Sequence, residues 1–395
     1  MEHAAEFDLI AAEHLRGVGG LKWSAFPDTI GAFVAEMDFG TAPAVTEALH
    51  GAVDLGLVGY LPPGIAGAMS RASAEWHRTV YGWDLAPEQV HPVADVLKAL
   101  EVVITSYSRP GSPVILPTPA YMPFLTVPPA LGRDVIQVPL RQDEDGTYAL
   151  DIDGIDAAYR AGGHLLILCN PYNPVGRVFS RTELMAVADV VAAHGGRVFS
   201  DEIHAPLVFP GARHLPYASL SEVTAGHTVT ATSASKAWNL PGLKCAQVIL
   251  SNEADARVWE QIGWLASHGA STLGVVANTA AFTAGQEWLE QVVRYLDGNR
   301  RALTDLLAEH LPQVGYAPPQ GTYIAWLDCR GLGIDGSPAD FFRQHAGVSL
   351  TDGTGCGDAG EGFVRLIFAT PRPILEQAVA SMGAAVRKAR VRLAG

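Results

Sequence analysis

The sequence predicts an α/β fold in which a mostly parallel sheet carries helices on both faces, together with a smaller α+β domain. Between residues 114 and 250, short apolar runs bounded by Gly, Pro and Asn recur, and helical segments such as 181–194 lie between several of them. This alternation is typical of parallel strands joined by helices. After about residue 280 the pattern changes to one long amphipathic helix, short strands and a closing helix, which predicts the α+β unit.

The length of 395 residues is too great for one ordinary core and predicts two domains. We expect an N-terminal arm (1–40) that packs with the small domain, a large domain (41–285) and a small C-terminal domain (286–395). The hydrophobic fraction of 48% and the charged fraction of 17% suit well-packed globular domains.

The charge balance argues against several classes of partner. With 27 Lys and Arg against 41 Asp and Glu, the formal net charge is −14, so nucleic acid and anionic membranes are poor partners. Four widely spaced cysteines show no zinc-binding spacing, and we expect reduced thiols and no metal. The sequence shows neither a signal peptide nor an apolar run of ~20 residues. These features predict a cytoplasmic protein with a small-molecule ligand.

Helical signals come first along the chain. Thr41 is expected to cap a helix with Pro43 in its first turn, and a second helix carries apolar residues at helical spacing from Met69 to Val80. Asp95 is the expected cap of a third helix over 96–104.

Strand signals follow from Val114 onward. Apolar runs bounded by turn residues predict strands at 114–116, 165–169, 197–200, 228–232 and 246–250. In the C-terminal part, a helix over 287–311, strands near 322–328 and 363–368, and a helix from residue 373 complete the prediction.

Three polar side chains each follow a different predicted strand. Asn173 lies in the loop NPYNPVG after 165–169, Asp201 follows the next strand, and Lys236 lies in the segment TSASK after 228–232. Taken singly, the loop around Asn173 is more typical of a tight turn, Asp201 is as typical of a helix N-cap, and Lys236 is more typical of a solvated loop. Because the carboxyl ends of parallel strands share one edge of a sheet, we expect the three to converge there.

An amide, a buried carboxylate and a lysine on one rim suit pyridoxal 5'-phosphate (PLP). Lys236 would bond to the aldehyde, Asp201 would keep the pyridine nitrogen protonated, and Asn173 would donate to the phenolate oxygen. A lysine fits the first task because its amine can lose its proton when shielded, which a guanidinium cannot do.

Candidate partners for the phosphate and the ring also follow from the sequence. The amides of Val96 and Leu97 begin a helix, and Ser233 and Lys244 flank Lys236. Asp95 beside them would repel a phosphate, so we expect its carboxylate to cap the helix and point away. The ring of Tyr121 is a candidate to stack on the pyridine. That group of residues completes the predicted cofactor site.

Together these segments resemble the fold type I PLP enzymes of the class I/II aminotransferase family. The resemblance rests on the NPYNPVG loop, the strand end at Asp201 and the Ser-x-Ser-Lys of 233–236. Further segments resemble the MalY/PatB branch of cystathionine β-lyase-like carbon–sulfur lyases, namely VAEMDF at 34–39, GY at 59–60, SDEIH at 200–204, WNLPGL at 238–243, GTYIAWLDCR at 321–330 and GEGFVRL at 360–366.

The resemblance implies further roles. Tyr60 would reach the cofactor phosphate of a neighbouring subunit, which implies a homodimer with shared active sites, and Arg365 would hold the substrate α-carboxylate. Tyr121 and Asn173 would also contact the substrate. The implied catalytic residues are Lys236, Asp201, Tyr121 and Tyr60. His204, counted with the cofactor site, stands where many aminotransferases carry a tyrosine, which favours the lyase branch.

Three positions depart from the pattern of that branch. Asp95 stands where glycine is usual, Ile367 where asparagine is usual, and Cys356 where phenylalanine is common. We expect such changes to alter the fit of the substrate more than the chemistry.

The expected reaction is a β-elimination that converts L-cystathionine or a related S-substituted L-cysteine to a thiol, pyruvate and ammonia. Lys236 would remove the Cα proton. Transamination between an amino acid and a 2-oxo acid uses the same residues and stays open as the alternative. A cofactor-binding regulator without turnover is the third possibility. A dinucleotide enzyme is disfavoured because no GxGxxG opens a helix after the first strand.

Overall fold

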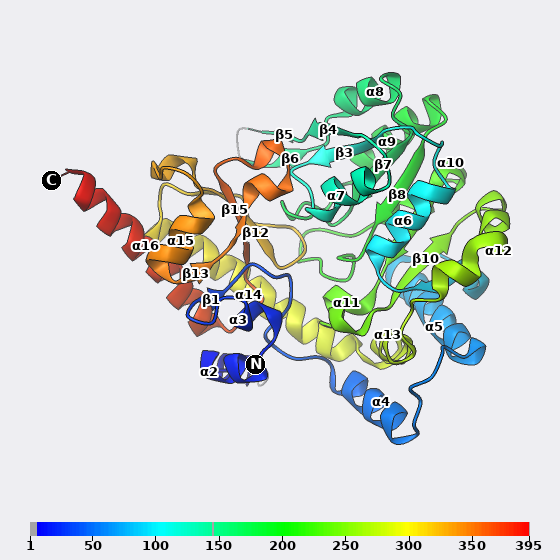
Figure 1. Cartoon of the computed structure of the whole chain (residues 1–395), viewed down its shortest axis with the longest axis horizontal. Coiled ribbons are helices and arrows are strands. Elements are labelled where there is room, and N and C mark those ends of the chain that lie inside the picture. Colours follow the sequence, from blue (N-terminus) through cyan, green and yellow to red (C-terminus); the bar gives the residue numbers. More distant parts are fainter. Residues whose placement is uncertain (1–5, 144–145, 395) are drawn as a thin grey trace.

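A seven-stranded sheet forms the centre of the computed structural model, which describes residues 6–143 and 146–394 (Figure 1). Only β10 runs antiparallel to its neighbours in this sheet, and every other pair of adjacent strands is parallel. The order across the sheet is β2 (Val90–Val93), β10 (Ala246–Leu250), β9 (Thr228–Thr232), β8 (Arg197–Asp201), β7 (Leu165–Cys169), β3 (Val114–Thr118) and β4 (Val135–Pro139). The mostly parallel α/β sheet is confirmed.

The extent of burial explains which strands could be predicted from the sequence. All residues of β3, β7, β9 and β10 are buried, so these strands appear as continuous apolar or β-branched runs. The outermost strands, β2 and β4, were not predicted. Pro92 interrupts β2, and most of β4 is only partly buried, as is usual for strands at a sheet edge.

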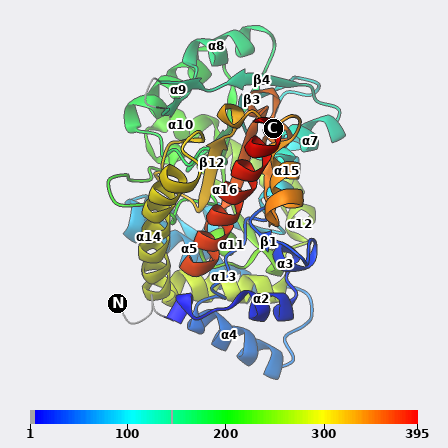
Figure 2. The same cartoon turned by 90° about the vertical axis from the view of Figure 1, so that its left-hand side faces the viewer.

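Helices cover both faces of this sheet (Figures 1 and 2). The helices between residues 40 and 285 are α4 (Pro43–Asp54), which packs on α13, then α5 (Pro63–Trp76), α6 (Val96–Ser106), α7 (Pro123–Ala130), α8 (Ile152–Arg160), α9 (Arg181–Ala193), α10 (Glu222–His227), α11 (Ala234–Ala237), α12 (Glu253–Ser267) and α13 (Thr272–Ala284). Asp95 caps α6 as predicted, because its Oδ1 accepts from the Lys98 amide at 2.8 Å. The prediction for Thr41 was wrong: Ala42 precedes α4 as its N-cap, and the Thr41 hydroxyl donates to the Trp238 carbonyl instead.

A second, antiparallel sheet belongs to the C-terminal part. Its order is β11 (Gly315–Tyr316), β12 (Ile324–Asp328), β15 (Phe363–Ile367) and β14 (Thr351–Asp352). The long helices α14 (Gln286–His310) and α16 (Arg372–Ala394) pack against each other (Figure 2), and α16 also packs against α15 (Pro338–Ala346). This is the α+β unit that the sequence predicted.

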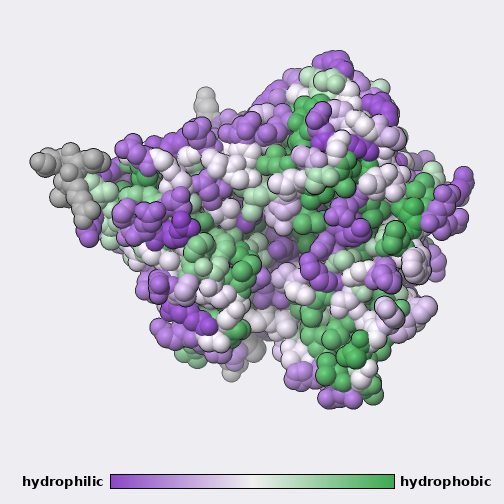
Figure 3. Space-filling view, viewed as in Figure 1, coloured by the Kyte–Doolittle hydropathy of each residue, from purple (hydrophilic) through white to green (hydrophobic). Residues whose placement is uncertain are grey.

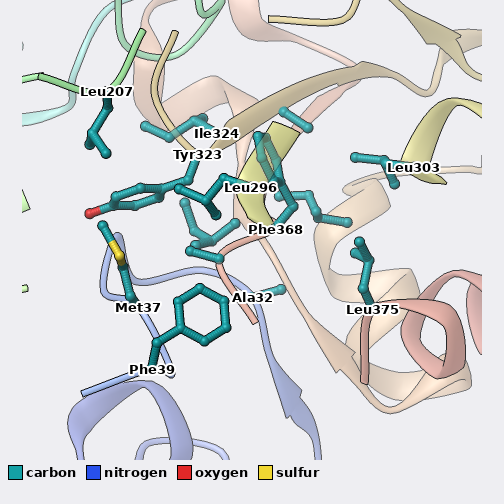
Figure 4. Close-up of a cluster of buried hydrophobic side chains, with 14 of the residues drawn as sticks. Ala32, Met37, Phe39, Leu207, Leu296, Leu303, Tyr323, Ile324, Phe368 and Leu375 are labelled. Carbon is teal, nitrogen blue, oxygen red and sulfur yellow. The ribbon is translucent and has the colours of Figure 1, made fainter. Parts of the chain in front are cut away.

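The N-terminal segment packs on that C-terminal part. After α2 (Ala12–Val18) and α3 (Leu21–Ser24), β1 (Ile30–Gly31) pairs in parallel with β13 (Val348–Ser349). Figure 4 shows side chains of residues 32–39 in one apolar cluster with side chains of α14, β12 and α16. These contacts support an arm that completes a small domain, and the boundaries at residues 40 and 285 remain our prediction.

Two further properties bear on ligands. None of the helices within the described ranges is long and apolar enough to cross a membrane, and the same residues contain no cluster of metal-ligating side chains. All four cysteines are buried and free.

Candidate active site

A cavity of about 170 Å³ lies where β7, β8 and β9 end. Larger hollows occur elsewhere on the surface, but here most of the predicted site residues come together. The lining residues are Ala35, Asp95, Val96, Leu97, Tyr121, Asn173, Asp201, Ile203, His204, Ser233, Ser235, Lys236, Pro241 and Lys244.

A second cavity of about 510 Å³ adjoins the first. The two share Ala35, Tyr121 and Lys236, and the second also contains Arg365. We call the first the inner cavity and the second the outer cavity.

Lys236 lies in the short helix α11, directly after β9. Its Nζ donates to the carbonyl of Ala35 at 2.9 Å, and burial, with Arg365 nearby, lowers the pKa of Lys236 to about 8. A lysine in this position spends more time as a neutral amine, which is the nucleophilic form.

Asp201 is the last residue of β8 and is only 4% exposed. It accepts from the Ile203 amide at 3.1 Å and from the Cys169 thiol at 3.8 Å, and burial raises the pKa of Asp201 to about 7. Within the described residues it forms no ion pair. A buried carboxylate of this kind is stabilised in its charged form by a cation placed against it.

Arg365 comes from β15 and is 3% exposed. Its Nη1 donates to Oδ1 of Asn173 at 3.3 Å, and its Nη2 donates to the Phe33 carbonyl at 3.1 Å and to the Thr351 hydroxyl at 3.3 Å. Its Nε has no partner, and no carboxylate of the described residues pairs with this guanidinium. A buried cation without an anion is suited to a carboxylate ligand.

The start of α6 forms another wall of the inner cavity through Val96 and Leu97. Amides of a first helical turn lack intrahelical partners and favour an anion. Asp95 departs in part from its prediction. It caps α6 through Oδ1, yet it lines the cavity, and its Oδ2 accepts from Lys244 Nζ at 2.9 Å. The cation that we predicted for a phosphate is thus held by this carboxylate.

Ser233 caps α11, and its hydroxyl donates to the Cys245 carbonyl at 2.7 Å. Ser235, whose hydroxyl lies 2.7 Å from that of Ser233, also lines the cavity and was missed. The Ser-x-Ser-Lys spacing was the signal that could have revealed it.

Tyr121 and His204 also line the inner cavity. Burial raises the pKa of Tyr121, whose ring packs edge-on against Phe124. Burial, with Lys236 and Arg365 nearby, lowers the pKa of His204 to about 3, so its imidazole is neutral. Its Nδ1 is buried without a hydrogen-bond partner.

Tyr60 is the one predicted site residue that lies apart. It is 90% exposed, packs near His268, and lines neither cavity. Cys356 and Ile367, two of the three departures noted above, are also buried outside the lining of both cavities. A single chain therefore leaves Tyr60 without a role in its own site.

Comparison with known proteins places this arrangement in a family. A profile described as aminotransferase class I and II matches residues 32–382. The chain belongs to this family. The resemblance deduced from the motifs is confirmed.

Relatives of this aminotransferase-family chain include named lyases. It is 38% identical to a cystathionine β-lyase of Corynebacterium glutamicum over 92% of this chain and 96% of that protein. It is 32% identical to the cystathionine β-lyase PatB of Bacillus subtilis over 90% and 93% of the two chains.

Solved structures give the same picture of the family fold. A putative PLP-dependent β-cystathionase of Corynebacterium diphtheriae superposes with a TM-score of 0.91 at 39% identity, covering 96% of this chain and 99% of that one. A PLP-bound C–S lyase of Staphylococcus hominis superposes with a TM-score of 0.87 at 28% identity, covering 96% and 98%.

Proposed function

We propose that the protein is a PLP-dependent carbon–sulfur β-lyase that converts L-cystathionine or related S-substituted L-cysteines to a thiol, pyruvate and ammonia. One observation carries the proposal: Lys236, Asp201 and Arg365 are buried around adjoining cavities, and neither Asp201 nor Arg365 forms an ion pair with any described residue. The similarity to proteins named cystathionine β-lyase supports the reaction.

The side chains fit the cofactor. Bound PLP supplies an aldehyde for the amine of Lys236 and a ring that accepts negative charge from the substrate Cα. Asp201 would bind the protonated ring nitrogen, and the positive charge on this nitrogen would stabilise the buried carboxylate of Asp201. The amides of Val96 and Leu97, with Ser233, Ser235 and Lys244, would hold the phosphate. Asn173 and Tyr121 would fix the ring from the remaining sides, beside the neutral His204.

The reaction places two tasks on the outer cavity. Arg365 would bind the α-carboxylate through its guanidinium fork, which orients the substrate so that its Cα proton faces Lys236. The amine of Lys236, with a pKa near 8, then accepts this proton at Nζ. The electron pair of the broken Cα–H bond would become a Cα=Cβ bond as the Cβ–S bond breaks, so that a thiolate departs and takes up a proton. Reaction of the remaining unsaturated amino acid with one water molecule would then give pyruvate and ammonia.

A homodimer with shared active sites is part of the proposal. Tyr60 belongs to a group of strongly exposed apolar side chains that also includes Val53, Leu55, Val58 and Trp264. Figure 3 shows green side chains gathered over α4, which carries Val53. Such groups are typical of association surfaces. In the dimer, Tyr60 of one subunit would reach the phosphate in the other.

We also propose a cytoplasmic location, because four free buried cysteines suit a reducing compartment.

The deciding experiment follows pyruvate and free thiol from the PLP-loaded protein with L-cystathionine. Catalytic release of both in equal amounts supports the lyase. A stoichiometric amount of keto acid, with conversion of the cofactor to its amine form, would instead establish transamination. Absence of either product from any S-substituted cysteine would favour a regulator. Lys236→Ala is the control, because it removes the amine that bonds to the cofactor.

A further inference from the structure

A second guanidinium lines the outer cavity besides that of Arg365. Arg343 belongs to α15, and its Nη2 donates to Oδ1 of Asp340 at 2.7 Å. Its Cζ lies 4.9 Å from the centre of the Phe26 ring. The ion pair and the ring fix the plane of the guanidinium, while its other N–H groups have no partner among the described residues.

The two guanidinium groups differ in depth. The whole residue Arg365 is 3% exposed, whereas the side chain of Arg343 is 37% exposed. Arg365 lines this cavity together with Lys236, and under the proposed function it would bind the carboxylate on the reacting carbon. The outer group lies nearer solvent and is available to another anionic group of the same ligand.

The surroundings of Arg343 match a particular kind of chemical group. Asp340 and Asp352 line the same cavity, and 58% of the Asp340 side chain is exposed. Asp352 is already bonded to Ser337 and to the Thr354 amide. Asp340 is therefore the carboxylate that can turn to a ligand ammonium. Together Arg343 and Asp340 offer one cation and one anion side by side.

Apolar side chains also line the outer cavity. The rings of Phe26 and Phe33 meet edge to face at 5.3 Å, and Met122 lines the same cavity. Such a wall suits a chain of methylene groups and a thioether sulfur.

We infer that the outer cavity contains a subsite for the distal end of the substrate, and that this distal end is a second amino-acid head group. Arg343 binds its carboxylate and Asp340 its ammonium. The inference rests on the proposed function and narrows it to substrates with a zwitterion on each side of the sulfur. L-cystathionine has this form, and S-alkyl cysteines do not.

The test compares L-cystathionine with S-propyl-L-cysteine, which lacks the distal charges. In Arg343→Gln, KM for L-cystathionine should rise about tenfold, equivalent to about 1.4 kcal/mol, with kcat little changed. KM for S-propyl-L-cysteine should change less than about twofold, since apolar contacts persist. Arg343→Lys keeps the positive charge but loses the paired N–H donors of the guanidinium. Its KM for L-cystathionine should therefore lie between those of the unaltered enzyme and of Arg343→Gln. Arg78→Gln is the matched control, because Arg78 is exposed and paired with Glu75 at the same helical spacing but lies outside the cavity.

A binding measurement separates this inference from the proposed function. L-cystathionine is titrated by calorimetry into the PLP-loaded Lys236→Ala protein, with and without Arg343→Gln. A roughly tenfold loss of affinity in the double variant supports the subsite. Equal losses for both substrates, or unchanged KM and affinity for L-cystathionine, overturn it. If the unaltered enzyme releases no pyruvate from either substrate, the proposed function fails, while the calorimetric comparison still decides the role of Arg343.

Discussion

The charged groups around the two cavities fall into a buried set and an exposed set. Asp201 and Arg365 are 4% and 3% exposed and form no ion pair with any described residue. The pairs Asp95–Lys244 and Asp340–Arg343 lie near solvent and are already neutralised. An uncompensated buried charge costs several kcal/mol, whereas an exposed pair contributes about 0–1 kcal/mol. The contrast indicates that the buried charges are the ones that gain most from a ligand group of opposite charge, whereas a ligand gains less from the exposed pairs.

The largest effect is expected from the buried cation. Arg365→Gln should lower kcat/KM for L-cystathionine on the order of 100-fold, about 3 kcal/mol, because the substrate carboxylate loses its buried partner. Absorbance of bound PLP should be retained, since Arg365 contacts no predicted cofactor ligand except Asn173. Loss of the chromophore with unchanged KM would contradict the assignment.

The pH dependence of the free energy of unfolding tests whether Asp201 is buried as a charged group. Burial raises its folded-state pKa to about 7, above the unfolded value, so the folded protein binds an extra proton between about pH 4 and 7 and loses stability as the pH rises through this range. In the PLP-free protein, Asp201→Asn should therefore raise the free energy of unfolding by on the order of 2–4 kcal/mol at about pH 8 and by little at about pH 4.

Urea denaturation of the PLP-free protein at the two pH values measures this difference. A gain that is the same at both would show that the carboxylate is not buried in its charged form. The PLP-loaded variant should lose activity, because the neutral amide no longer holds a protonated ring nitrogen.

Tyr60 extends the comparison to the proposed sharing of active sites between two subunits. Tyr60→Phe should weaken PLP binding roughly tenfold, the effect of one hydrogen bond to a charged group. At limiting PLP, a mixture refolded from Tyr60→Phe and Lys236→Ala subunits should be more active than either parent, because one site of the mixed dimer regains both residues. Purely additive activity in the mixture would rule out sharing.

The smallest effect is expected from Asp95 and Lys244, the exposed pair beside the proposed phosphate site. Asp95→Asn preserves the cap of α6, since asparagine caps as well as aspartate, and it frees Lys244. The Kd for PLP, measured by absorbance titration, should fall about twofold to fivefold. Asp156→Asn, which removes a partly exposed partner of Arg160 and His194 outside both cavities, serves as the control. A weaker affinity in Asp95→Asn would mean that the carboxylate serves the cofactor.

How far the sequence could predict the molecule depended on how local each signal was. The strands that precede Asn173, Asp201 and Lys236 were visible because they are short, buried and bounded by turn residues. The proposed role of Arg365 came only from the family resemblance, since it contacts Asn173 and Phe33, which lie 192 and 332 positions earlier in the chain.

Arg343 illustrates the same limit. On the sequence it is a charged residue in an amphipathic helix, and only the packing of α15 beside β13 and β14 brings it to the cavity. The prediction that Thr41 caps a helix was wrong for a related reason. Its hydroxyl donates to the carbonyl of Trp238, a residue far along the chain, instead of capping the helix that follows it.

The hydrogen bond between Arg365 and the Phe33 carbonyl ties an early segment of the chain to a late one at the place where substrate should bind. During synthesis, the amine of Lys236 is made long before the guanidinium that would orient its substrate. A chain truncated before β15 would at most bind PLP. It would lack Arg365, the residue proposed to hold the carboxylate of the amino-acid substrate. Only chains whose translation has passed β15 can therefore turn over substrate.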